Sequence, residues 1–243
     1  MSKQELAILF SGSVDSLALY VLSAVGRHPD ISRPRKMHLL CMQNGALRFM
    51  AFPFERFKIA EKILKAQAPS TEPVPESSFV ELDTARLFQG LWLNQCEELM
   101  PQYNGKNLVC TACMLAMHTR AVIYCVERLV PVCIASCSGN QSCCPQQTDT
   151  FITKVMAFSY GFGITTRFPA DSDFDDDMVT KHLLEDHGLP SANGGERKCL
   201  FEKTHTLATE KEIGSYLDAM LPHLNKYVES RLEGKIRDAA ECF

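Results

Sequence analysis

The stretch "AILFSGSVDS" (residues 7–16) decides the fold, because it leads from an apolar run through a small polar turn into a helical pattern. The run 6–10 is typical of a buried strand, and residues 14–26 carry apolar side chains at helical spacing. Ser11, Gly12 and Ser13 form the turn between them. Further strand and helix patterns follow this first pair along the chain.

Short strand patterns alternate with helical patterns through most of the sequence. Strands are predicted at 36–42, 78–83, 130–137 and 163–170, and helices at 54–68, 109–129, 148–162 and 174–190. Strands separated by crossover helices predict an α/β fold, a parallel five-stranded sheet with helices on both faces. We expect one domain over residues 1–202 and a short C-terminal helical tail over 203–243.

Composition narrows the function classes. The 243 residues carry a net charge of −4, which gives no general attraction to nucleic acid or anionic membranes. The start of the chain does not resemble a signal peptide, and we expect no membrane partner. Eleven cysteines without an export signal indicate reduced thiols, some of them metal ligands, in a cytoplasmic protein.

The polar turn has two interpretations, and the sequence leaves both open. Ligands of parallel sheets bind at the carboxyl ends of the strands, where backbone N–H groups at a helix start attract anions. Ser11, Ser13 and Ser16 add hydroxyl groups there, and Asp15 could hold a metal ion beside a phosphate. The same residues also suit an ordinary helix start with Ser13 or Ser11 as N-cap.

The motif "SGSVDS" (residues 11–16) resembles the Ser-Gly-Gly-x-Asp-Ser loop of the PP-loop ATP pyrophosphatases, and the resemblance covers about residues 5–202. It implies a Rossmann-like (HUP-type) fold and an enzyme that cleaves ATP to AMP and pyrophosphate while adenylating an acceptor. The nucleotide and Mg²⁺ would be bound by the loop, with Asp15 and Ser16 also acting in catalysis; the loop residues are Ser11, Gly12, Ser13, Asp15 and Ser16. The family's second glycine is Ser13 here, and a Cβ at that position could crowd the pyrophosphate.

Two further stretches extend the resemblance. Gly139, after the fourth predicted strand, stands where the family has a glycine-containing nucleotide loop. The stretch "ITTRFPA" (residues 164–170) is similar to the Ile-Arg-Pro-Leu stretch of the tRNA-thiolating members. That similarity implies a catalytic contact between Arg167 and a phosphate or the adenylate.

Three cysteines form the predicted metal site. Cys110 and Cys113 have C-x-x-C spacing at a helix start, which puts both sulfurs on one face and favours thiolates. Cys199 follows much later in a polar loop. The order resembles the iron–sulfur thiolation enzymes, in which three cysteines hold a [4Fe–4S] cluster with one open iron. The partners implied are ATP, a sulfur donor and an acceptor, either a tRNA base or a small molecule, with a homodimer as a possible assembly.

Several alternatives remain open. The cysteines could bind zinc instead, with His118 or His205 completing the set, or the C-x-x-C spacing could be accidental. Cys137, Cys143 and Cys144 could relay sulfur or merely line a nucleotide loop. The alternative functions are an amide- or nitrile-forming ligase with structural zinc, and a non-catalytic nucleotide-binding protein.

Overall fold

The computed structural model describes most of the chain. The described residues are 4–28, 31–48, 51–69, 73–136, 148–169, 177–189, 198–201, 204 and 206–234.

A parallel five-stranded sheet forms the centre of the molecule. Its strands are β1 (Glu5–Leu9), β2 (Lys36–Gln43), β3 (Glu76–Asp83), β4 (Val132–Ala135) and β5 (Thr165–Arg167), in the order β3-β2-β1-β4-β5. Leu6 of the central strand lies opposite Met37 on one side and Val132 on the other, both in parallel register. The predicted α/β fold and its strand sequence are therefore confirmed, although β5 is shorter than the predicted run.

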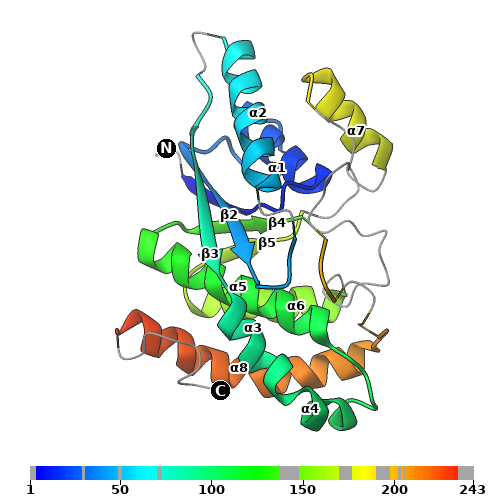
Figure 1. The fold of residues 1–243 in the computed structure, drawn as a ribbon. Helices are drawn as coiled ribbons and strands as arrows, with labels where there is room; N and C mark the ends of the chain where they lie inside the picture. The colour runs from blue at the N-terminus through cyan, green and yellow to red at the C-terminus, as the bar shows by residue number, and fades with distance from the viewer. Residues whose placement is uncertain are drawn as a thin grey trace.

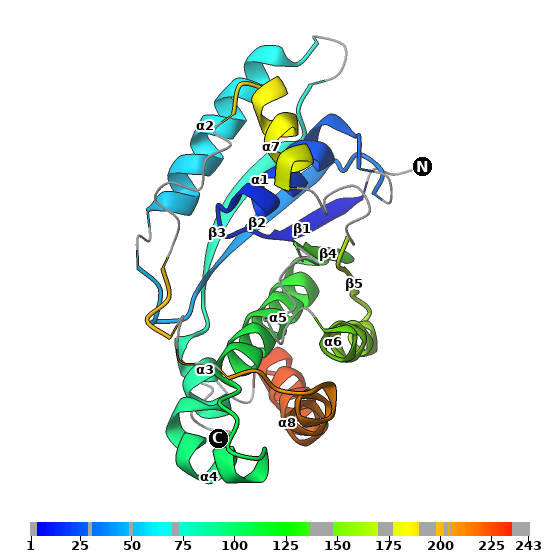
Figure 2. The ribbon, with the colours of Figure 1, turned by 90° about the vertical axis from the view of Figure 1, so that its right-hand side faces the viewer.

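Helices cover both faces of this sheet (Figures 1 and 2). They are α1 (Val14–Val25), α2 (Phe52–Gln67), α3 (Ala85–Leu91), α4 (Cys96–Gln102), α5 (Val109–Arg128), α6 (Asp149–Gly161), α7 (Asp177–Asp186) and α8 (Glu210–Leu232), with a 3₁₀ turn η1 (Leu93–Gln95) before α4. Figure 2 shows α1, α2 and α7 on one face and α5 and α6 on the other, with α8 lying beyond them.

Alternating side chains of β1 explain why both faces are covered. Leu6 and Ile8 pack into the apolar cluster that includes α1, whereas Ala7 packs into the cluster that includes α5. Helix α5 is long and apolar enough to cross a membrane, but 67% of its apolar window is buried inside the molecule. Its apolar character therefore matches its position as a core helix.

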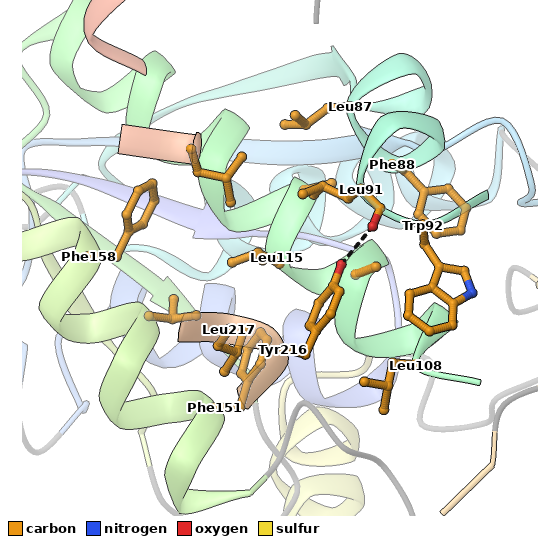
Figure 3. Close-up of a cluster of buried hydrophobic side chains, with 14 of the residues drawn as sticks. Leu87, Phe88, Leu91, Trp92, Leu108, Leu115, Phe151, Phe158, Tyr216 and Leu217 are labelled. Carbon is orange, nitrogen blue, oxygen red and sulfur yellow. Dashed lines mark hydrogen bonds between the residues drawn. The ribbon is translucent and has the colours of Figure 1, made fainter. Parts of the chain in front are cut away.

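The C-terminal helix α8 belongs to a large apolar cluster with α3, α5 and α6 (Figure 3). The hydroxyl of Tyr216 donates a hydrogen bond of 3.0 Å to the carbonyl oxygen of Leu91, and its ring packs edge-on against Trp92 and Tyr103. At the start of α8, Thr209 and Glu212 form a capping box. Helix α8 lies within the segment 203–243 and packs on the same core. The division into a domain and a tail stays a prediction, and residues 202 and 203 lie outside the described residues.

Candidate functional site

The serine turn lies at the point where the sheet reverses its order. From β1 the chain moves to β2 and β3 on one side, and β4 and β5 lie on the other side. Open α/β sheets bind ligands at the carboxyl ends of the strands at such a point. Ser11, Gly12 and Ser13 follow β1 directly, so the predicted turn occupies this position.

Three serine hydroxyls gather over the first turn of α1. Ser13 is the N-cap, and its Oγ accepts a hydrogen bond of 3.4 Å from the Ser16 backbone N–H. The Oγ of Ser11 lies 2.9 Å from that of Ser13 and 3.2 Å from that of Ser16. The N-cap interpretation of Ser13 is therefore confirmed. The hydroxyl cluster also stands at the positive end of the helix dipole, where anions are stabilised.

Gly12 is required by the packing of this turn. Its φ of +79° lies in the left-handed region that favours glycine. A Cβ added there would meet the Cα of Pro53 at 2.8 Å and a ring carbon of Phe52 at 3.3 Å. The start of α2 thus packs directly against the turn that follows β1.

Of the other two residues predicted to bind the nucleotide, the structure describes Asp15 but not Gly139. Asp15 is half-buried in the first turn of α1. Gly139 lies outside the described residues, together with Cys137, Cys143 and Cys144. Their place relative to the turn stays a prediction.

Arg167 is the last residue of β5, opposite Ile134 of β4. It is among the residues that line a cavity of about 110 Å³. The cavity is also lined by Gln4, Glu5 and Val132, which stand at the amino ends of β1 and β4. The residues that line this cavity do not include those of the serine turn. The contact between Arg167 and a nucleotide stays a prediction.

Cys110 and Cys113 occupy the first turns of α5, where both are partly buried. The side-chain amide nitrogen of Asn44 donates a hydrogen bond of 3.1 Å to the Cys113 sulfur. Asn44 directly follows β2, so this contact puts Cys113 at the carboxyl edge of the sheet. The same edge carries the serine turn after β1.

The segment that carries Cys199 returns to this edge. Its backbone pairs antiparallel with residues 46–48 through hydrogen bonds from Arg48 N–H to the Lys198 carbonyl (2.8 Å) and from Leu200 N–H to the Ala46 carbonyl (2.9 Å). A little further along, the backbone N–H of Thr206 donates to the carbonyl of Asn107, just before α5. The chain path brings Cys199 back toward the start of α5, as a shared site requires.

The three cysteines pack against one apolar cluster, but their side chains do not form a metal-binding group. Cys110, Cys113 and Cys199 all pack against the same apolar cluster. Among the described residues, no group of three His, Cys, Asp or Glu side chains lies close enough to hold a metal ion. The donor chemistry, three partly buried thiols, suits a thiolate-bound metal, and closing the site would require the thiols to approach one another.

His118 belongs to the core. It is 1% exposed and packs between the rings of Phe151 (6.0 Å) and Phe168 (5.1 Å). Burial lowers the pKa of its imidazole to about 4, and its Nε2 has no hydrogen-bond partner among the described residues. Its ring therefore faces aromatic side chains, and His205, the other candidate zinc ligand, lies outside the described residues.

A buried polar network was missed by the sequence analysis. His38 on β2 contacts Glu5 of β1 through Nε2 (3.0 Å) and Tyr124 of α5 through Nδ1 (2.9 Å). The hydrogen bond from His38 is the largest cause that lowers the pKa of the Glu5 carboxyl, and Arg35 adds a second partner. A single histidine in an apolar strand gives no sequence signal for such a network. It lies toward the amino edge and links the sheet to α5.

The sequence and the structure were compared with known proteins. No family model matches the sequence, and no curated protein matches it. Among solved structures, the chain is similar to the U34-tRNA thiolase NcsA from Methanococcus maripaludis with its [4Fe-4S] cluster, at 12% identity and a TM-score of 0.43. The overlap covers 96% of this chain and 72% of that one.

Proposed function

We propose that this protein is an ATP pyrophosphatase of the PP-loop type that adenylates an acceptor and transfers sulfur to it. One observation carries the proposal: the "SGSVDS" turn stands at the switch point of the sheet, with three serine hydroxyls over the start of α1. The return of the Cys199 segment to the same edge supports the sulfur-transfer part.

In this proposal the serine turn binds the phosphates of ATP. The backbone N–H groups at the start of α1 and the hydroxyls of Ser11, Ser13 and Ser16 would donate to phosphate oxygens. Gly12 lets the turn pack tightly on α2, and Asp15 would hold Mg²⁺ beside the phosphates. A bound phosphate would take over hydroxyl donors that now bond to one another.

The cysteines Cys110, Cys113 and Cys199 would hold a [4Fe–4S] cluster at the same edge. Such a cluster, with one iron open, supplies a site that can carry sulfide to an adenylated carbon. The acceptor would be a tRNA base or a small molecule, the sulfur would come from a separate donor, and reduced thiols fit a cytoplasmic location. Zinc bound by the same thiols is the competing metal.

Calorimetric titration with a non-hydrolysable ATP analogue and Mg²⁺ tests the nucleotide site. We expect Asp15→Ala and Ser16→Ala to weaken binding about tenfold, because each loses a polar contact to a charged ligand. Asp218→Ala is the control, since that carboxylate lies exposed on α8 beside Lys154. Equal affinities in all four proteins would remove the turn as the nucleotide site.

Anaerobic purification tests the cysteine site. We expect iron, sulfide and a broad absorption near about 400 nm in the wild type, and their joint loss in Cys110→Ala, Cys113→Ala and Cys199→Ala. Cys125→Ala is the control, because that thiol is fully buried between α5 and the sheet and its loss should cost only about 1 kcal/mol of stability. Stoichiometric zinc in place of iron would favour the ligase alternative. AMP and pyrophosphate release with candidate acceptors then tests turnover.

A further inference from the structure

Asn44 connects two parts of the proposed cysteine site. It is 4% exposed, at the carboxyl end of β2, and its amide nitrogen donates to the Cys113 sulfur at 3.1 Å. Its side-chain oxygen accepts a hydrogen bond of 2.9 Å from the Ala46 backbone N–H. Because a backbone N–H can only donate, the oxygen end of the amide is fixed at Ala46 and the nitrogen end must face the sulfur.

The second partner of Asn44 leads to Cys199. Ala46 is the residue whose carbonyl oxygen accepts the Leu200 N–H, and Leu47 stands opposite Cys199 in the same short ladder. One buried carboxamide therefore holds the Cys113 sulfur at one end and the anchoring strand of Cys199 at the other.

We propose that Asn44 is a positioning residue that sets Cys113 and Cys199 relative to each other before a metal binds. The inference rests on the proposed function, because the separation of these two thiols matters only if they share a ligand. A donor aimed at a sulfur stabilises the thiolate that binds a metal, and residues that hold ligands in place typically contribute tenfold or more to metal affinity.

The decisive variant is Asn44→Asp. It keeps the size of the side chain and the oxygen that accepts from Ala46 N–H, but it replaces the donor to Cys113 with a carboxylate oxygen. Asn44→Ala removes both contacts, so it also loosens the 46–48 ladder. Asn94→Asp is the matched control, because Asn94 is exposed in η1.

Two measurements on the 243-residue protein report how close the Cys113 and Cys199 thiols lie to each other. The first is the rate at which a short bifunctional thiol reagent links Cys113 to Cys199 in the metal-free protein, with the linked peptides identified by mass spectrometry. The second is the dissociation constant for Co²⁺, followed by its thiolate charge-transfer absorption. Thermal unfolding of each variant shows whether the fold is retained.

We expect Asn44→Asp to lower the linking rate several-fold and to weaken Co²⁺ binding about tenfold, in a protein that still unfolds cooperatively, at a lower midpoint because the carboxylate is buried. Asn44→Ala should show the same losses and a lower midpoint, and Asn94→Asp should match the wild type. Unchanged linking and Co²⁺ binding in Asn44→Asp would overturn the proposal. If the wild type binds neither iron nor Co²⁺, the proposed function fails. The linking rate then still decides whether Asn44 sets the distance between the Cys113 and Cys199 thiols.

Discussion

Replacing His118 should change how the stability of the protein depends on pH. The imidazole is buried between two phenylalanine rings, and burial lowers its pKa from 6.5 to about 4. In the unfolded chain the same group takes up a proton below pH 6.5. Between these values the unfolded state binds more protons than the folded state, so the free energy of unfolding must fall as the pH falls.

The expected magnitude follows from the two pKa values. Each pKa unit corresponds to about 1.4 kcal/mol, so the separation between 6.5 and about 4 gives a contribution of about 3 kcal/mol. The contribution of His118 is fully present above pH 6.5 and is lost progressively down to about pH 4. Glu5 adds a loss of its own at low pH, because its pKa is lowered by His38, but that loss is common to wild type and variant.

Urea unfolding between pH 7 and pH 4 measures this slope, with the fluorescence of Trp92, the single tryptophan, as the probe. We expect His118→Leu to flatten the pH dependence of the unfolding free energy by about 3 kcal/mol over the whole interval. His223→Leu, at an exposed position of α8, is the control and should keep the wild-type slope. A His118→Leu profile parallel to that of the wild type would refute the buried, neutral state of this imidazole.

Three further substitutions test the packing around the candidate site. Gly12→Ala should cost about 2 kcal/mol or more in urea unfolding, because of its positive φ and the close approach of α2, whereas Gly161→Ala, with open space around it, should be tolerated. Tyr216→Phe should lower the free energy of unfolding by about 1–2 kcal/mol, because it leaves the buried Leu91 carbonyl without its donor. An unchanged midpoint would show that this hydrogen bond makes no net contribution to stability. Arg167→Ala tests the predicted nucleotide contact. We expect slower AMP formation at a nearly unchanged unfolding midpoint, whereas a lower midpoint with unchanged AMP formation would make Arg167 a structural residue of the cavity that it lines.

The helices and strands that depend on a short stretch of sequence were predicted correctly. The apolar run of β1, the small turn and the periodic helix α1 are each visible within about ten residues, and the sheet with its helices on both faces follows from repeating that unit. The short helices α3 and α4 escaped prediction. Each is seven residues long, and Pro101 stands inside α4, so neither offers the extended periodicity that marks a helix.

Contacts between distant segments could not be predicted in this way. Asn44 contacts Cys113 across 69 residues, and no local pattern selects that pair. For Arg167 the strand was predicted, but the cavity that it lines with Gln4 and Ile31 combines segments far apart in the sequence, which no local pattern selects.

The connection between β2 and α2 joins the two halves of the proposed site. Its first residues hold the cysteine region, through Asn44 on Cys113 and Leu47 opposite Cys199. Helix α2, which follows this connection, starts against the serine turn, because a Cβ added at Gly12 would meet the Cα of Pro53 at 2.8 Å.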